Sequence, residues 1–244
     1  MQTHIPYYIP VLFLSLVLVL LFFILKYLNE SLNKTYEKIK TKRIILITTS
    51  ILILWLLFLY LLSTNNILNN YSAMPPRMLL VIIPPLIVAL IFTFSKTVLS
   101  WLKNVPLQYL IYLQTFRVVV EFILWLLYRN NIIPVQMTFE GRNYDILIGL
   151  SALFTGYYYV KGIEFFKNKW VLIFWNVAGL ILLANIVVIA ILSAPFPFRQ
   201  FMNELANTII FYFPYVLLPG FLVPVAYTTH LLSLKKLLSE KNTS

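Results

Sequence analysis

The sequence contains no cysteine and very few charged residues. The lack of cysteine excludes disulfides, thiolate metal sites, iron–sulfur clusters and a cysteine nucleophile. Charged residues make up 11% of the chain and hydrophobic residues 61%, whereas a soluble domain carries about 25% charged residues. A water-soluble fold of 244 residues has no way to bury so much apolar surface. The composition therefore predicts a protein embedded in a lipid bilayer, so lipid is an expected partner.

Further absences narrow the classes of function. The sequence has no Gly-rich phosphate loop, no HExxH, no GxSxG and no twin-carboxylate motif. No predicted span contains lysine, which excludes a retinal Schiff base. The two histidines, His4 and His230, are expected near opposite faces of the membrane and so cannot ligate one haem or metal together. We therefore expect no metal, no cofactor and no assignable catalytic residue, and an enzyme is the less favoured class.

The apolar residues occur in runs of about 18 to 24, which is long enough to cross a hydrocarbon core of about 30 Å. The runs predict one all-α transmembrane domain over residues 1–244, a multi-pass bundle of seven transmembrane helices. The predicted spans are Tyr7–Leu25, Ile44–Leu62, Met78–Phe94, Pro106–Leu127, Asp145–Val160, Trp170–Leu192 and Thr208–Thr228. The first run lacks a basic n-region and a small-residue cleavage site, so we interpret it as an uncleaved span.

The distribution of basic residues predicts the orientation of the bundle. If the N-terminus lies outside and the C-terminus inside, every lysine falls in an inner segment. The basic residues of the outer loops are then all arginines, namely Arg77, Arg129, Arg142 and Arg199. This asymmetry follows the positive-inside rule. The net charge of +11 is thus explained by short loops that set orientation, and no nucleic-acid partner is expected.

A weak internal similarity suggests a repeat. Leu61–Ser63 closes the second span and Ile191–Ser193 closes the sixth, and a proline follows each at the same distance, Pro84 and Pro214. Many membrane carriers are built from two structural repeats. The pattern is compatible with a three-plus-one-plus-three arrangement of helices.

The fourth span carries the strongest functional signal. Gln114, Arg117 and Glu121 are spaced i, i+3 and i+7, so they lie on one face of a helix. A charged residue at this depth costs about 2.5–3.5 kcal/mol on insertion scales, although Arg117 and Glu121 can neutralise each other. Two interpretations remain open: an ion pair that fixes helix packing, and a site for a solute or a relay.

Other polar features are expected at the same depth, in the outer half of the membrane. Asn185 of the sixth span falls at the level of Glu121, and Pro84 and Pro214 free backbone carbonyls there. Such carbonyls must be buried in protein or line a wet cavity. The coincidence predicts a polar pocket open to the outer face. Asn176 lies deeper and on the opposite face, so we interpret it as an interhelix packing contact.

The loop Val135–Asp145 is much more polar than its surroundings. A turn followed by a helix N-cap, formed by Asn143 or Asp145, accounts for part of its composition. The adjacent Glu140 and Arg142 are less well explained in that way. Our alternative interpretation places these two side chains at the mouth of the predicted pocket.

Several strings resemble an uncharacterised family of bacterial seven-transmembrane-helix membrane proteins. They are QTFRVVVE at residues 114–121, VQMTFEGRNYDILIGLSA at 135–152, WNVAGLILLANIVVIAILSAP at 175–195 and FPYVLLPGFLVPVAY at 213–227. The resemblance implies a location in the bacterial plasma (inner) membrane and brings no known activity. The topology is also similar to that of the SWEET sugar carriers and the KDEL receptor, but the Pro-Gln pair typical of that group is absent from the first and fifth spans.

Three functions remain as hypotheses. The leading one is a protein that binds or transports a small polar or anionic solute through an outward-facing pocket. Its predicted ligand-binding residues are Gln114, Arg117, Glu121, Asn185, Glu140 and Arg142. The second is a structural or accessory subunit that packs against a membrane protein partner. The third is an intramembrane enzyme acting on a lipid-linked substrate, with Glu121 or Glu140 as the general base.

Overall fold

The computed structural model describes residues 5–202 and 204–239, and these residues form helices and turns but no strand. Helices satisfy the backbone hydrogen bonds internally, as the bilayer interior requires. The α-helices are α1 (Tyr8–Asn33), α2 (Lys38–Thr64), α3 (Leu79–Phe94), α4 (Lys96–Leu102), α5 (Leu107–Leu113), α6 (Phe116–Arg129), α7 (Ile146–Lys161), α8 (Glu164–Lys167), α9 (Lys169–Ser193) and α10 (Val223–Ser239). The loops add the 3₁₀ turns η1 (Ile67–Asn69), η2 (Val135–Met137) and η3 (Ile209–Phe211) and the π turn η4 (Leu218–Leu222).

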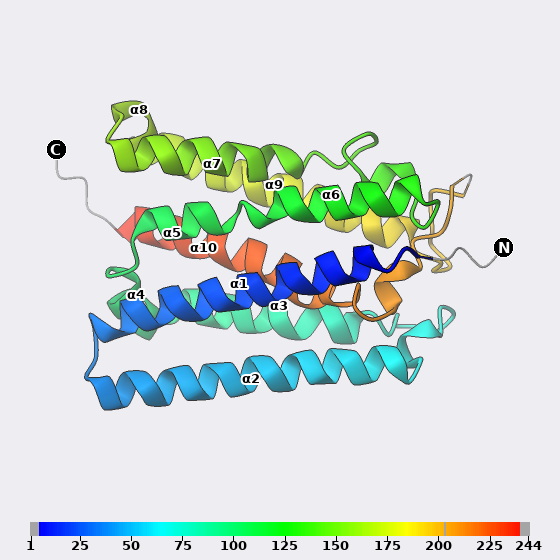
Figure 1. Ribbon diagram of the computed structural model, residues 1–244, viewed down its shortest axis with the longest axis horizontal. Helices are drawn as coiled ribbons and strands as arrows, with labels where there is room; N and C mark the ends of the chain where they lie inside the picture. Colours follow the sequence, from blue (N-terminus) through cyan, green and yellow to red (C-terminus); the bar gives the residue numbers. More distant parts are fainter. Residues whose placement is uncertain (1–4, 203, 240–244) are drawn as a thin grey trace.

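Most of these helices run side by side along the long axis of the molecule (Figure 1). Within the described ranges, four stretches are long and apolar enough to cross a membrane: α1, α2, Leu107–Arg129 (α5 with α6) and α9. The pair α3–α4, which bends by 72°, makes a fifth if it is counted as one span. The prediction of an all-α protein is therefore confirmed for the described residues, and several of its helices suit a membrane-spanning protein. The helices α7 and α10 are shorter, with 16 and 17 residues.

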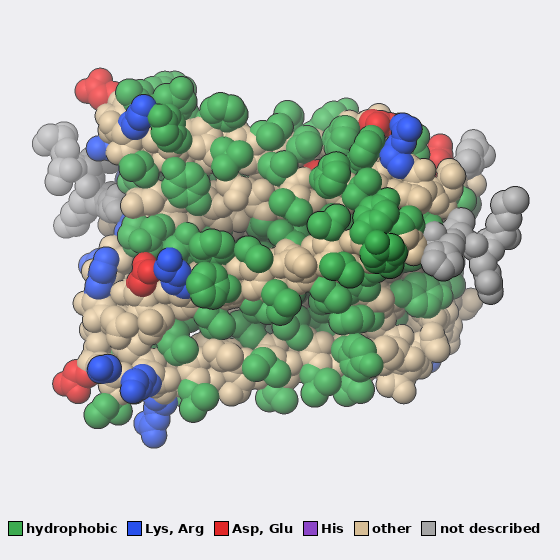
Figure 2. Space-filling view, in the orientation of Figure 1, with side chains coloured by type: hydrophobic (Ala, Val, Ile, Leu, Met, Phe, Trp, Pro, Cys, Tyr) green, Lys and Arg blue, Asp and Glu red, His purple; other side chains and the backbone are tan. Residues whose placement is uncertain are grey.

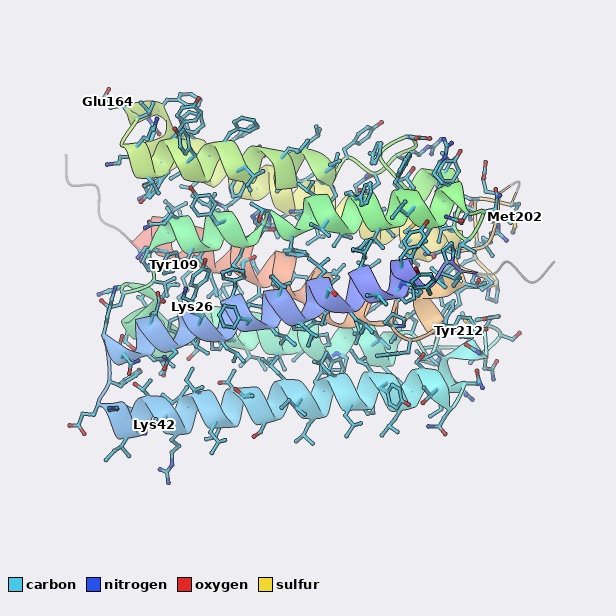
Figure 3. The ribbon with its side chains drawn as sticks, in the orientation of Figure 1. Lys26, Lys42, Tyr109, Glu164, Met202 and Tyr212 are labelled. Carbon is cyan, nitrogen blue, oxygen red and sulfur yellow. The ribbon has the colours of Figure 1, made fainter. Side chains whose placement is uncertain are left out.

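The surface carries a hydrophobic middle between two more polar ends (Figure 2). Lys26, Lys42 and Glu164 lie toward one end of the long axis, whereas Met202 and Tyr212 lie toward the other (Figure 3). Large apolar side chains are exposed along the middle of α2 in particular. Lipid chains rather than water are the natural surroundings of such a surface.

The predicted span boundaries agree well with α3, α7 and α9. The first two helices are longer than predicted, because α1 continues to Asn33 and α2 already begins at Lys38. The extension of α2 is rich in lysine and that of α1 in other polar residues, and hydropathy assigns such residues to a loop. They extend the helical pair beyond the apolar belt.

The predicted seventh helix, Thr208–Thr228, is wrong in its first half. This part forms η3, a turn and η4, and a regular α-helix begins only at Val223. Pro214 and Pro219 explain the difference, because proline lacks an N–H donor and its ring clashes with the preceding helical turn. The helix then continues to Ser239, well beyond the predicted end.

The two proline-rich segments do not share a structure. Helix α3 is continuous across Pro84 and Pro85, whereas residues 208–222 contain only short helical turns. The matching positions of Pro84 and Pro214 therefore lend no structural support to the three-plus-one-plus-three repeat.

Side chains of α2 satisfy carbonyls that the broken segment leaves free. The Trp55 indole nitrogen donates to the Gly220 carbonyl at 2.8 Å. The Ser63 hydroxyl donates to the Phe211 carbonyl at 2.9 Å. Irregular backbone at membrane depth is tolerated when protein groups hydrogen-bond to its carbonyls. Helix α2 therefore stabilises the irregular segment that precedes α10.

Two lysines of α10 hold the bent pair α3–α4 at the opposite end. Lys235 Nζ donates to the carbonyls of Thr93 and, at 2.6 Å, Ser95, where α3 ends. Lys236 Nζ donates to Leu102 at 3.2 Å and to Lys103 at 2.9 Å, where α4 ends. A cation near the C-terminus of a helix also interacts favourably with the helix dipole.

Small residues let α7 approach α5 and α6 closely. A Cβ atom added at Gly149 would lie 2.8 Å from the backbone nitrogen of Val118, and one added at Gly156 would lie 2.6 Å from the Tyr112 ring. Ala152, between these glycines, is fully buried. Small residues of this kind are common where membrane helices are in contact. This contact fixes the start of α7 beside the middle of the fourth predicted span.

Replacing Gly149 by valine should therefore destabilise the protein by about 1–3 kcal/mol, the usual range for overpacking, because the backbone of α6 cannot move aside locally. Unfolding of the purified protein in detergent would measure the change. Leu150→Val is the control, since Leu150 is exposed on the same helix. Equal stability of the two variants would contradict the close contact.

Candidate functional site

The site is centred on an interruption in the span Leu107–Arg129. The amides of Gln114 and Thr115 donate to carbonyls three residues earlier, those of Ile111 and Tyr112, both at 3.0 Å. This local 3₁₀ geometry separates α5 from α6. Such tightening in the middle of a helix often marks a functional position.

Arg117, one turn after the interruption, is the centre of the polar contacts. Its side chain is buried, with 1% of the residue exposed. Nε donates to Asp145 Oδ2 at 2.7 Å and Nη2 donates to Asp145 Oδ1, which is the bidentate arrangement of a strong arginine–carboxylate pair. Nη1 lies 2.9 Å from His230 Nε2 and 3.4 Å from Gln114 Oε1. Nη2 also approaches the Gly179 carbonyl at 3.4 Å.

The contact with Arg117 determines the protonation state of His230. A guanidinium group only donates hydrogen bonds, so His230 Nε2 must accept and carries no proton. His230 Nδ1 then carries the proton and donates to Asn176 Oδ1 at 2.9 Å. Asn176 Nδ2 donates in turn to the Leu172 carbonyl at 2.8 Å. His230 is therefore a neutral imidazole that connects α10 with α9.

Gln114 extends the same network to a second position on α10. Its Nε2 donates to Thr229 Oγ1 at 2.6 Å and to the Ala226 carbonyl at 3.1 Å. Gln114 is fully buried. Its two ends thus join Arg117 to α10, as the shared helix face predicted for Gln114 and Arg117 allows.

Glu121 does not pair with Arg117, and this corrects the expected neutralisation of the two. Glu121 Oε1 instead accepts from Asn143 Nδ2 at 2.6 Å. Asn143 Oδ1 also accepts from the amide of Asp145 at 3.1 Å, which forms an Asx turn directly before α7. Asp145 occupies the N-cap position of α7, but its side chain does not cap the helix because both carboxylate oxygens bond to Arg117. The predicted side-chain cap of this helix is therefore not formed.

The second oxygen of the Glu121 carboxyl group is different. Glu121 is 1% exposed, and its Oε2 has no hydrogen-bond partner among the residues that the structure describes. More than nine in ten buried polar groups in proteins have a partner. An unpaired buried carboxyl oxygen therefore requires an explanation.

Glu121 is one of the residues that line a cavity of about 90 Å³. The cavity lies between α3, α6, α9 and the η4–α10 segment. Its lining residues are Met78, Ile82, Phe116, Arg117, Val120, Glu121, Leu124, Met137, Asp145, Leu183, Ile186, Val187, Ala190, Ile191, Phe196, Ile210, Leu218, Pro219, Leu222, Val223, Ala226 and Tyr227. Three of them are charged or acidic, and almost all the others are apolar. A cavity therefore lies beside Arg117 and Glu121, but its wall is mostly apolar, whereas the sequence predicted a polar pocket. Its opening to the outer face stays a prediction.

The other predicted ligand-binding residues lie outside the cavity wall. Asn185 Nδ2 donates to the Arg142 carbonyl at 2.9 Å, and the Arg142 guanidinium lies 5.4 Å from the centre of the Phe201 ring. Glu140 Oε1 accepts from the Trp125 indole at 2.6 Å. Asn185, Glu140 and Arg142 therefore hold the loop before α7 against its neighbours, and a role at the mouth stays a prediction.

Sequence reasoning missed Asp145 and His230 as partners of Arg117. Asp145 was assigned to helix capping, and His230 was expected near the inner face because the seventh helix was predicted to start too early. Asn176 was expected to make an interhelix contact, and its bond to His230 confirms that. His4 lies outside the described residues, as does Lys241.

Within residues 5–202 and 204–239, no group of three or more histidine, aspartate or glutamate side chains is arranged to hold a metal ion. The polar cluster around Arg117 instead contains one arginine, two carboxyl groups, one neutral histidine and uncharged amides. Its chemistry is that of binding, ion pairing and proton exchange.

Removing Asp145 should be among the most damaging changes in the protein. Asp145→Ala leaves the buried Arg117 charge without its partner, which typically costs about 3–5 kcal/mol. The double variant Arg117→Met/Asp145→Leu should recover much of that loss, because an apolar pair often replaces a buried ion pair without cost. Unfolding in detergent measures both.

Glu164→Ala is the matched control, since Glu164 is an exposed acid on α8. A surface change of this kind should stay within about 0.5 kcal/mol of the wild type. An Asp145→Ala variant as stable as Glu164→Ala would rule out the ion pair as a structural centre.

No protein-family model, curated protein or solved structure matches the chain. The function must therefore be inferred from the site itself. Two of its features matter most: the bidentate Arg117–Asp145 pair and the unpaired oxygen of Glu121 at the wall of the cavity.

Proposed function

We propose that this integral membrane protein binds or transports a small solute in the cavity beside Glu121. The observation that carries the proposal is the buried Glu121 Oε2, which lacks a partner at a cavity wall. A cluster that served packing alone would satisfy its buried polar groups. An anionic solute would have to displace Asp145 from Arg117, so a solute that approaches Glu121 is favoured.

We further propose that the chain makes seven transmembrane passes in a bacterial inner membrane, with the N-terminus outside. The helices α7 and α10 lie alongside the longer helices (Figure 1). At about 1.5 Å per residue, each approaches the thickness of the hydrocarbon core, and the turns before α10 add to its length. With this topology the cavity lies in the outer half of the bundle, because its wall includes residues of the loops at that end.

An accessory subunit of a larger complex is the second candidate. The observation that favours it is the exposure of α2, since only 6% of the most apolar 18-residue stretch of this helix is buried within the protein. A membrane protein partner would cover this helix as readily as lipid does. Purification of the protein with a stoichiometric membrane partner would support this candidate.

The topology can be tested directly, because the chain has no cysteine of its own. A membrane-impermeant maleimide should label Gln200→Cys in intact cells, whereas Lys42→Cys should react only after the cells are permeabilised. Both positions are exposed. Labelling of both in intact cells, or the reverse pattern, would contradict the proposed orientation.

Filling the cavity should abolish binding without unfolding the protein. Ala190 lines the cavity, whereas Ala184 on the same helix is exposed. A thermal-unfolding screen of small amines, alcohols, carboxylates and sugars should identify solutes that stabilise the wild type and the Ala184→Leu control. The same solutes should not stabilise Ala190→Leu. If no solute in the screen distinguishes Ala190→Leu from the control, the cavity is not a binding site.

A further inference from the structure

The buried charges at the site do not balance. The positive charge of Arg117 is matched by the negative charge of Asp145, and His230 is neutral because its Nε2 accepts from Arg117. Glu121 is the remaining ionisable group of the cluster. An ionised Glu121 leaves the cluster with one negative charge at membrane depth, where an unbalanced charge is costly.

In the part of the chain that the structure describes, no other element packed around the cavity supplies the missing positive charge. The residues that α3, α9 and η4 contribute to the wall are all apolar. Helix α10 adds Tyr227, whose hydroxyl is buried and unpaired among the described residues. The buried side chains in the first half of α1, which packs on α6, are also apolar. Glu121 therefore needs either a proton or a cation from outside the protein.

The wall distinguishes an organic cation from a metal ion. Hard metal cations require several oxygen ligands, and the wall offers one free carboxyl oxygen and one phenol. It also presents the rings of Phe116, Phe196 and Tyr227 with the thioethers of Met78 and Met137. Aromatic faces attract organic cations, and methionine adapts to ligands of different shape. Both features suit a cation that carries apolar groups.

We propose that the cavity binds a small organic cation, such as a quaternary ammonium group, in exchange for one proton on Glu121. This inference rests on the proposed binding function and names the ligand class. In the empty state Glu121 is a neutral carboxylic acid. When the cation enters, the proton leaves to solvent and the carboxylate pairs with the cation, so one positive charge replaces another.

Asn143 positions the carboxyl group in both states. Its Nδ2 donates to Glu121 Oε1 at 2.6 Å, which leaves Oε2 for the proton or for the cation. The cavity of about 90 Å³ is smaller than the roughly 150 Å³ apolar cavity that takes benzene in an engineered protein. Tetramethylammonium, with five heavy atoms, is therefore a suitable probe.

The test uses the purified full chain in detergent. Tetramethylammonium chloride, compared with sodium chloride at equal ionic strength, should raise the unfolding temperature in a saturable way. In weakly buffered solution with a pH indicator, binding should release up to one proton per protein. Glu121→Gln, which keeps the acceptor for Asn143, should bind at least tenfold more weakly and release no proton. Glu164→Gln, on the exposed α8, should behave as the wild type.

The neutral isostere tert-butanol separates the two levels of the proposal. If it stabilises the wild type as well as tetramethylammonium does, or if Glu121→Gln binds tetramethylammonium normally, the cavity binds solutes without charge recognition. The cation inference then fails while the proposed binding function stands. Binding of the cation to the wild type without proton release overturns the exchange, and this measurement requires no variant. Failure of both probes overturns the inference, and the Ala190→Leu screen decides the binding function separately.

Discussion

The bidentate pair between Arg117 and Asp145 is the interaction on which the interior of this protein depends. A guanidinium group close to the middle of a membrane span is stable only when its charge and its donors are satisfied. Asp145 provides the charge, and His230 and Gln114 take further donors. Through these contacts one side chain joins α6 to the start of α7 and to α10.

The pair also explains the form of the neighbouring cavity. Because Arg117 forms its ion pair with Asp145, it does not pair with Glu121, which lies one turn away on the same helix. The loop before α7 then supplies Asn143 to only one oxygen of the Glu121 carboxyl group. The close contact of Gly149 with the backbone of α6 keeps this loop in place. The packing of α7 on α6 thus contributes to leaving one oxygen of the Glu121 carboxyl group without a partner among the described residues.

Hydropathy and charge distribution were sufficient to predict an all-α membrane protein and most of its helices, since both depend on average composition over many residues. The polar face of Gln114, Arg117 and Glu121 was also predictable, because helical spacing places all three together. The partner of Arg117 was not predictable in this way. Glu121 is near in sequence, but Asp145 is near in space, and only the packing of α7 reveals it. His230 was misplaced because prolines delay the start of α10.

Helix α10 carries Thr229 and His230 within the cluster and Lys235 and Lys236 at the ends of α3 and α4. One helix therefore connects the buried cluster around Arg117 to the ends of α3 and α4. A Cβ atom added at Gly179 would lie 2.4 Å from the His230 ring, so α9 and α10 are in close contact at this point. Any change in the position of α10 at the cluster would consequently also alter its contacts with the ends of α3 and α4.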